Sequence, residues 1–222
     1  MGKNKWARFQ ENAGFSCLYQ PDFEEVFAKD WHLKGRWNRE VFGRTAPICL
    51  ELGCGKGEYT LALAQKYPER HFIGIDIKGA RLWRGAKTAT ELSLSNVAFI
   101  RTRIECIASL FAPNEIHEIW ITFPDPQIQK ERKRLTHPMF LERYRKFLRP
   151  HAAIHLKTDS RLLYDYSLHL VMESGYPVLH ADPDIYGSGL VRQIDILGVQ
   201  TFYEKQYLAQ GKPITYLSFR LN

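Results

Sequence analysis

Residues 48–57 read Ile-Cys-Leu-Glu-Leu-Gly-Cys-Gly-Lys-Gly, and this stretch decides the fold of the chain. Apolar residues lead into Glu51, three glycines follow at alternating positions, and a helix-compatible pattern begins at Glu58. A buried strand that passes through alternating glycines into a helix is a place where backbone approaches a ligand closely. The stretch therefore predicts a strand over 48–52 and a ligand site at its carboxyl end.

The spacing of the glycines distinguishes between classes of ligand. A dinucleotide site has the pattern Gly-x-Gly-x-x-Gly and holds a pyrophosphate at the helix N-terminus. Here the pattern is Gly-x-Gly-x-Gly, and Glu51 lies two residues before Gly53. A carboxylate would repel a pyrophosphate, but it suits a ligand that carries an ammonium or a sulfonium group. S-adenosylmethionine carries both, so it is the expected ligand, and an NAD-linked oxidoreductase is disfavoured.

A second acid supports this interpretation. Residues 71–76, His-Phe-Ile-Gly-Ile-Asp, have the pattern of another strand, which ends on Asp76. In doubly wound folds an acid at this place holds ribose hydroxyls, and hydrogen bonds to charged groups contribute about 1.5–3 kcal/mol each. Either acid alone is more often a solvated strand end. Both acids together with the glycines favour a ligand site.

Strand and helix patterns alternate through the rest of the chain. Strands are predicted at 48–52, 71–75, 97–101, 117–123, 152–157 and 214–220, and helices at 58–66, 79–92, 104–111, 137–148 and 160–174. Such alternation predicts an α/β fold, with a mostly parallel central sheet and helices on both faces. Residues 1–44 are expected to form an N-terminal extension with one or two short helices, such as Phe23 to Lys29, before a domain over 45–222.

Composition limits the class of protein. The 222 residues are 45% hydrophobic, and no stretch approaches the ~20 apolar residues of a membrane span. The N-terminus has no apolar segment typical of secretion. Cysteines at 17, 49, 54 and 106 form no Cys-x-x-Cys pair, and the histidines have no ligand spacing, so we expect a cytoplasmic protein without a metal site.

Basic residues are concentrated in one segment. The net charge is +7, and residues 130–149 hold eight Lys or Arg against two Glu. The densest part is Lys-Glu-Arg-Lys-Arg at 130–134. Such a run is usually a solvated face, but a basic protein with this concentration of charge is also typical of one that binds a polyanion.

Three further loops contain candidate site residues. In Thr-Phe-Pro-Asp-Pro, 122–126, two prolines restrict the backbone around Asp125, which is either a plain turn or a rigidly presented carboxylate. In Lys-Thr-Asp-Ser, 157–160, Asp159 or Ser160 could cap the next helix. Thr-Phe-Tyr-Glu, 201–204, matches a capping box, which is the better interpretation on spacing alone.

The order of these motifs resembles a known family. Glu-Leu-Gly-Cys-Gly-Lys-Gly, Gly-Ile-Asp, Phe-Pro-Asp-Pro, Arg-Lys-Arg-Leu-Thr-His-Pro-Met-Phe-Leu, His-Leu-Lys-Thr-Asp and Thr-Phe-Tyr-Glu-Lys follow one another as in the bacterial tRNA (guanine-N7-)-methyltransferases. The resemblance runs from about residue 45 to the C-terminus. It implies a Rossmann-like class I methyltransferase fold, S-adenosylmethionine as donor, and a guanosine of the tRNA variable loop as acceptor.

The resemblance also implies roles for single residues. Asp125 would be the catalytic residue. The donor would be bound by Glu51, Gly53, Gly55, Asp76, Ile77, Arg103, Ile104 and Asp125. The substrate would be bound by Lys130, Asp159, Thr201, Phe202, Tyr203 and Glu204.

Two departures from the family pattern concern these roles. Arg103 stands where the family usually has an acid, and an arginine cannot accept a bond from the adenine amino group. Backbone near Ile104, or Glu105, would then read the adenine. After Asp125 this chain has Gln-Ile-Gln in place of the family's Trp-Pro and longer basic run, so Lys130 is the equivalent of the family's substrate lysine.

The expected mechanism needs no protein nucleophile, because guanine N7 carries a free lone pair and no proton. Asp125 would hold the base, and tRNA would be the partner of a monomer or homodimer. Three rival functions stay open. A methyltransferase of exocyclic amines would have an aromatic residue after its strand-four prolines, a small-molecule methyltransferase would not need the basic run, and a non-catalytic RNA-binding subunit is compatible with Arg103.

Overall fold

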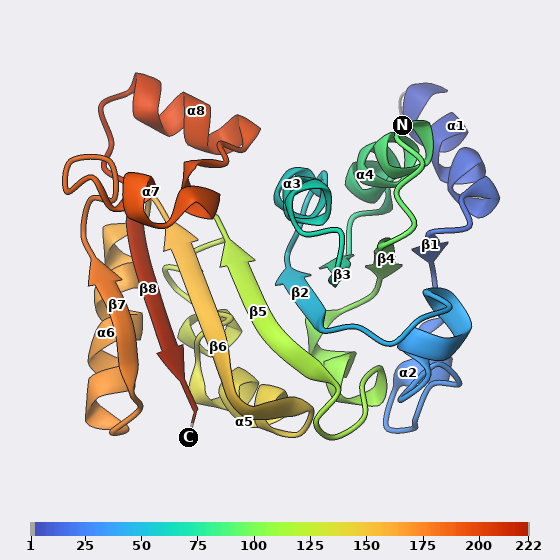
Figure 1. The fold of residues 1–222 in the computed structure, drawn as a ribbon, viewed down its shortest axis with the longest axis horizontal. Coiled ribbons are helices and arrows are strands. Elements are labelled where there is room, and N and C mark those ends of the chain that lie inside the picture. The colour runs from blue at the N-terminus through green and yellow to red at the C-terminus, as the bar shows by residue number, and fades with distance from the viewer. Residues whose placement is uncertain (1–2, 222) are drawn as a thin grey trace.

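An eight-stranded sheet organises residues 3–221, the part of the chain that the computed structural model describes (Figure 1). The strand order is β1-β4-β3-β2-β5-β6-β8-β7. The strands are β1 Leu18–Tyr19, β2 Ile48–Leu52, β3 His71–Asp76, β4 Val97–Arg101, β5 Ile116–Thr122, β6 Leu148–Thr158, β7 Val178–Asp182 and β8 Thr215–Arg220. β1 to β6 pair in parallel, and β8 pairs antiparallel with both β6 and β7. The mostly parallel α/β sheet that the sequence predicts is confirmed.

Two strands were not predicted from the sequence. β1 has two residues, too few for a periodic pattern. β7 reads Val-Leu-His-Ala-Asp, and it is mostly exposed, so no apolar alternation marks it. β6 begins at Leu148 rather than at residue 152, and the helix expected over 137–148 is correspondingly shorter.

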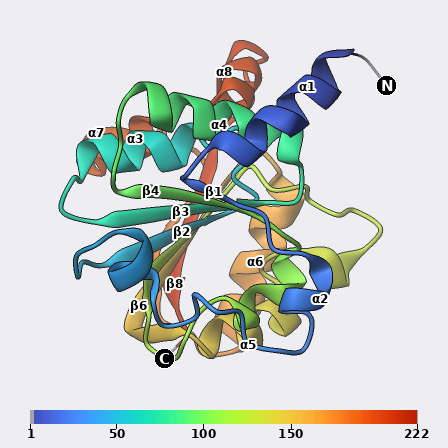
Figure 2. The same ribbon diagram turned by 90° about the vertical axis from the view of Figure 1, so that its right-hand side faces the viewer.

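Helices cover both faces of the sheet (Figure 2). In this view α1, α3 and α4 lie above the strands, and α5 and α6 lie below them. The α-helices are α1 Lys3–Glu11, α2 Phe23–Val26, α3 Glu58–Lys66, α4 Gly79–Glu91, α5 Pro138–Arg145, α6 Arg161–Glu173, α7 Leu190–Gln193 and α8 Phe202–Ala209. Short helical turns of other types are η1 Asn12–Gly14, η2 Trp37–Val41, η3 Ile104–Ser109, η4 Glu131–Lys133 and η5 Asp195–Gly198. The expected helices over 104–111 and Phe23 to Lys29 are therefore a 3-10 helix and a single α-turn.

Residues before the first long strand pack on the sheet. Leu18 and Tyr19 pair with Phe99 and Ile100 at the edge of the sheet. Trp37 is fully buried, and its indole N–H donates to the carbonyl of Leu110 at 3.0 Å. The expected division of the chain between residues 44 and 45 stays a prediction.

The order of the strands places a crevice beside β2. The chain runs from β2 to β3 and β4 on one side of the sheet and then returns to β5 on the other side of β2. In open parallel sheets, ligands bind beyond the carboxyl ends of the strands at such a reversal. Glu51 of β2 pairs in register with Trp120 of β5. The glycine loop that follows β2 therefore lies at this reversal of the strand order.

Candidate functional site

The glycine loop after β2 has a left-handed backbone. Gly53, Gly55 and Gly57 have φ of 74°, 58° and 70°, which side-chain-bearing residues rarely adopt. At Gly57 a Cβ atom would also lie 2.5 Å from Cε1 of Phe99, so only glycine fits there. The loop therefore exposes backbone at the carboxyl end of β2, as predicted.

Glu51 is buried among hydroxyl groups at the end of β2. The residue is only 3% exposed. One carboxylate oxygen accepts from the N–H of Thr60 at 2.8 Å and from the Thr60 hydroxyl, and the other accepts from the Thr122 hydroxyl at 2.5 Å. Burial nevertheless raises the pKa of Glu51 to about 7, and these hydrogen bonds oppose the rise. The carboxyl group can therefore change its charge near neutral pH.

Asp76 connects two loops at the end of β3. One of its carboxylate oxygens accepts from the N–H of Gly55 at 2.9 Å, and the other accepts from the N–H of Lys78 at 2.7 Å. Each oxygen has a further lone pair that can accept from a ligand. The acid thus fixes the glycine loop relative to β3 and borders the cavity described next.

A cavity of about 340 Å³ lies at the carboxyl ends of β3, β4 and β5. Its volume is in the range typical of small-molecule sites. Donor-site residues predicted from distant parts of the sequence line it together, namely Gly53, Asp76, Ile77, Arg103, Ile104 and Asp125. Apolar side chains of Phe123, Leu135 and Phe140 complete its wall. The ends of β3, β4 and β5 thus border one cavity, whereas Glu51 and residues 157–159 are not among its lining residues.

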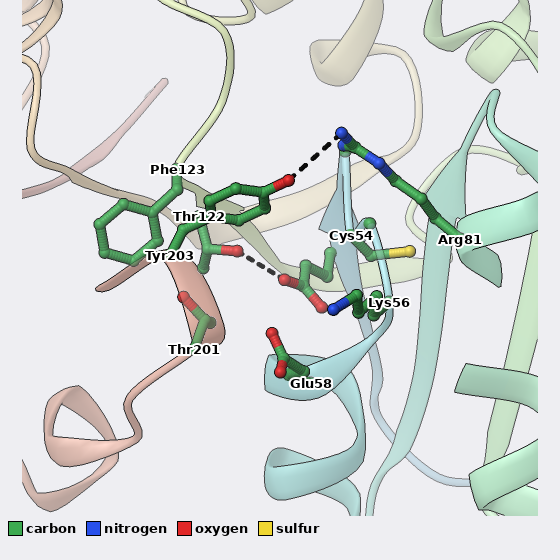
Figure 3. A pocket seen from close by; sticks show the side chains of 11 residues that line it. Cys54, Lys56, Glu58, Arg81, Thr122, Phe123, Thr201 and Tyr203 are labelled. Atoms are coloured by element: carbon green, nitrogen blue, oxygen red, sulfur yellow. Dashed lines mark hydrogen bonds between the residues drawn. The ribbon is translucent and has the colours of Figure 1, made fainter. Parts of the chain in front are cut away.

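A smaller hollow of about 60 Å³ lies between the glycine loop and the N-terminus of α8 (Figure 3). Glu51, Gly55, Thr201 and Tyr203 are among its lining residues. The guanidinium of Arg81 donates to the Tyr203 hydroxyl at 3.4 Å, a contact that is drawn as a dashed line in Figure 3. Gly53, Arg81 and Phe123 line both hollows, so the two are neighbouring parts of one site.

The start of α8 is attached to the glycine loop by two further contacts. The N–H of Phe202 donates to the carboxylate of Glu58 at 3.0 Å. The ammonium of Lys56 lies 4.5 Å from the centre of the Phe202 ring. These contacts place the predicted substrate residues Thr201, Phe202 and Tyr203 beside the donor-site residues.

Asp125 lies in an exposed loop after β5. Phe123 and Gln127, on either side of the Pro-Asp-Pro turn, both have a φ of 47°, a conformation that is costly for non-glycine residues and that clusters at functional sites. The N–H of Gln127 donates to the Asp125 carboxylate at 3.0 Å, and the N–H of Phe123 donates to the carbonyl of Lys157 at 2.8 Å. The turn therefore presents a fixed carboxylate to the cavity.

Glu204 takes part in a buried ion pair. The ammonium of Lys157 lies 2.8 Å from one oxygen of Glu204 and 2.9 Å from the other, and both side chains are fully buried. The same ammonium donates to the carbonyls of Leu197 at 2.6 Å and Val199 at 3.0 Å, and the Tyr186 hydroxyl donates to Glu204 at 2.8 Å. Lys157 thereby ties β6 to the segment that leads into α8.

Both predicted helix caps form, one of them in part. The side chain of Ser160 accepts from the N–H of Leu163, at the start of α6. The side chain of Thr201 accepts from the N–H of Glu204 at 3.3 Å. In a complete capping box the Glu204 carboxylate would accept from the N–H of Thr201. Here that carboxylate binds Lys157 instead, so the expected box is only half present.

Asp159 and the basic run lie around the same edge of the sheet. Asp159 is half-buried, and burial raises its pKa. Lys130, Arg132 and Lys133 are exposed on and beside η4. Arg134 differs from the rest of the run, because it is 6% exposed, donates to the carbonyl of Pro126 at 3.2 Å and lies over the ring of Tyr166. Arg134 braces the loop that contains Asp125.

Several residues of the site had no role assigned to them from the sequence. Thr60 and Thr122 hold Glu51, Arg81 lines both hollows, and Lys157 positions α8. For Thr60 the sequence offered one local signal, its position in the first turn of the helix that follows the glycine loop. The roles of Arg81 and Lys157 depend on contacts between distant elements, and the spacing of residues along the chain does not reveal such contacts.

Comparison with known proteins places this site in a family. Residues 45–217 match the family described as "Putative methyltransferase". The tRNA (guanine-N(7)-)-methyltransferase of Christiangramia forsetii is 53% identical over 99% of this chain and 98% of its own length. That of Bacteroides thetaiotaomicron is 46% identical over 100% of this chain and 87% of its own length. The chain belongs to the tRNA (guanine-N(7)-)-methyltransferase family. The resemblance seen in the motifs is thus confirmed.

Solved structures confirm the fold of this family member. The 16S rRNA methyltransferase KamB has a TM-score of 0.61 over 82% of this chain and 90% of its own, at 15% identity. A SAM-dependent methyltransferase from Aquifex aeolicus has a TM-score of 0.54 at 14% identity, over 84% of this chain and 94% of its own. At such identities the likeness concerns the fold alone, which is the predicted class I methyltransferase fold.

Two further findings concern membrane-spanning helices and metal sites. Among residues 3–221, no helix has the length and apolar character needed to cross a membrane. Over the same part of the chain, His, Cys, Asp and Glu side chains form no group of three or more that could hold a metal ion. The four cysteines are all unpaired thiols, and Cys49 and Cys54 are buried beside the glycine loop.

Proposed function

We propose that this protein transfers a methyl group from S-adenosylmethionine to N7 of a guanosine in the variable loop of tRNA. One observation carries the proposal: Asp76, Ile104 and Asp125, at the ends of three strands, line a single cavity beside the glycine loop. Family membership supports the reaction, since the relatives have the name tRNA (guanine-N(7)-)-methyltransferase.

The residues of the two hollows fit such a donor chemically. Asp76 has carboxylate lone pairs for ribose hydroxyls, and apolar Ile77 and Ile104 can cover the faces of an adenine ring. Glu51, when ionised, favours the cationic end of the ligand. Arg103 can offer only donors, so adenine recognition would fall to backbone near Ile104. When bound, S-adenosylmethionine supplies an electrophilic methyl group.

Asp125 would hold the guanine that receives the methyl group. Its carboxylate can accept from the N1–H and the exocyclic amine of guanine, both of which are donors. This grip directs N7 away from Asp125, and orientation of this kind can lower a barrier by up to ~7–11 kcal/mol. Because the methylated base becomes cationic, a nearby carboxylate also favours the charge that develops. N7 carries no proton, so none of the protein's residues has to act as a base on it.

Other predicted residues would hold the tRNA around this base. Lys130, Arg132 and Lys133 can contact phosphates, which makes binding weaken as salt rises. Thr201 and Tyr203 line the small hollow, and Phe202 packs against Lys56 of the glycine loop. Asp159, after β6, would contact the substrate as well. We infer that Glu204 acts through Lys157 and the start of α8, because its carboxylate is fully buried. With tRNA as substrate the protein would work in the cytoplasm, as a monomer or homodimer.

The test is to incubate the protein with labelled donor and bulk tRNA and to map the modified nucleoside. The expected product is 7-methylguanosine from the variable loop. Asp125→Asn should abolish turnover while donor binding, measured by calorimetry, weakens only in part. Asp165→Asn, on the exposed face of α6, is the matched control and should retain activity. Transfer of the label to small molecules, or to a different base of the tRNA, would contradict the proposal. Near-full activity of Asp125→Asn would contradict the grip on guanine.

A further inference from the structure

Two exposed aromatic rings stack on one another, one at the first residue of α2 and one directly after its last residue. Phe23 is 48% exposed and Phe27 is 60% exposed. Their ring centres are 4.8 Å apart and their planes differ by 30°. Large apolar side chains scattered singly on a surface need no explanation, but here two adjoining rings both stay about half exposed.

This pair lies beside the donor cavity. The guanidinium carbon of Arg103, a residue that lines the cavity, is 5.5 Å from the centre of the Phe23 ring. On its other side, Phe27 borders a hollow of about 460 Å³ between α2, η3 and α5. Glu105 lines both the cavity and this hollow, so the aromatic pair stands where the two meet.

Among the charged residues that line the hollow, cations outnumber acids. Lys29, Lys34, Arg143 and Lys146 line it, against Asp30 and Glu105. Asp30 is already paired with Lys34 at 2.5 Å. Lys29 and Lys146 are both exposed, so the hollow keeps an excess of positive charge at its rim.

A second cation–aromatic contact lies along the same edge of the sheet. The guanidinium carbon of Arg101, at the end of β4, is 4.7 Å from the centre of the exposed Phe9 ring on α1. In Figure 2, α1 and α2 lie on the same side of the molecule, one above and one below the strand ends. Alternating exposed aromatic rings and arginines at one edge are typical of surfaces that bind single-stranded nucleic acid.

We propose that Phe23 and Phe27 form a stacking platform for an unpaired base next to the methylated guanosine, while Lys29 and Lys146 contact the adjoining phosphates. This inference rests on the proposed function. A guanine that enters the cavity must leave its stack, so its neighbours lose a stacking partner and need a replacement. Aromatic rings and arginine planes supply one in RNA-binding proteins. The four cations against two acids in the lining favour a polyanion over a protein partner.

The test compares tRNA binding by the wild-type chain and by the double variant Phe23→Ala/Phe27→Ala. The tRNA dissociation constant should rise at least fivefold, which corresponds to about 1 kcal/mol of lost stacking. Donor affinity by calorimetry and the salt dependence of tRNA binding should stay unchanged, since no charge is removed. Phe23→Tyr/Phe27→Tyr keeps the rings and should bind tRNA like the wild type. Lys29→Gln/Lys146→Gln should flatten the salt dependence.

Met172→Ala, at an exposed apolar residue of α6, is the matched control and should leave tRNA affinity unchanged. Circular dichroism and thermal melting establish that each variant folds. Unchanged tRNA affinity of the alanine double variant would overturn the platform, and so would a change confined to the oligomeric state. If the wild type methylates tRNA while the double variant binds it normally, only the platform fails. If the wild type neither binds nor methylates tRNA, the proposed function fails as well.

Discussion

Replacement of Glu51 by glutamine should stabilise the unliganded protein and weaken donor binding at the same time. Burial raises the pKa of Glu51 to about 7, from an ordinary value near 4.5, so the folded state binds the proton more tightly than the unfolded chain. The stability contributed by the protonated carboxyl is fully present below pH 4.5 and is lost as pH rises through about 7. At pH 8 the lost contribution approaches ~3 kcal/mol.

Glutamine avoids this loss because it stays neutral. Its carbonyl can accept from Thr60, and its amide can donate to the Thr122 hydroxyl, which is free to rotate. Urea unfolding without ligand should therefore give Glu51→Gln and wild type similar free energies of unfolding at pH 4.5. The variant should become more stable by up to ~3 kcal/mol at pH 8. Glu69→Gln, at an exposed position, should show no such pH-dependent difference.

Donor binding provides the second measurement on the same variant. The ionised Glu51 should attract a cationic ligand, so the affinity of the wild type should rise with pH through about 7. Glu51→Gln should lose roughly tenfold or more in affinity at pH 8, and the rise with pH should disappear. A stability difference between the two proteins that is constant from pH 4.5 to 8 would refute the assigned protonation. Unchanged donor affinity would refute the assigned contact.

Three further experiments test other contacts. Asp76→Asn should raise the donor KM about tenfold, with kcat for tRNA nearly unchanged at saturating donor, as steady-state kinetics would measure. Lys157→Met should lower the free energy of unfolding by ~3–5 kcal/mol in urea, because it leaves the Glu204 carboxylate buried and unpaired, and a second change, Glu204→Leu, should recover most of the loss. Arg132→Gln/Lys133→Gln should lower the slope of log affinity for tRNA against log salt by roughly one to two, as filter binding at several salt concentrations would detect.

The central strands and the glycine loop could be predicted because each has a local cause. β2 is buried along its whole length and is apolar except for Glu51, and a strand of this kind is typical of the middle of a parallel sheet. The left-handed φ of Gly53, Gly55 and Gly57 requires glycine, so the loop is visible as a spacing. The edge strand β7 has neither feature, and it joins the sheet by pairing with β8.

The partners of the predicted acids could not be found in this way. Glu51 accepts from Thr122, which lies 71 residues further along the chain, and no spacing rule relates the two. Thr-Phe-Tyr-Glu correctly predicted the cap by Thr201, but the side chain of Glu204 turns to Lys157. A lysine is rarely fully buried, and the strand pattern at 152–157 gave no sign that this one would be.

Lys157 connects the two walls of the site through different atoms. Its carbonyl accepts from the N–H of Phe123, which begins the loop that contains Asp125, and its ammonium holds Glu204 and the carbonyls before α8. A change of side chain removes only the second set of bonds. The position of Asp125 should therefore survive Lys157→Met, whereas the start of α8 loses its anchor. For this reason the functional effect of that variant should fall on substrate and donor affinity more than on the rate at saturation, which is the reverse of the effect expected for Asp125→Asn.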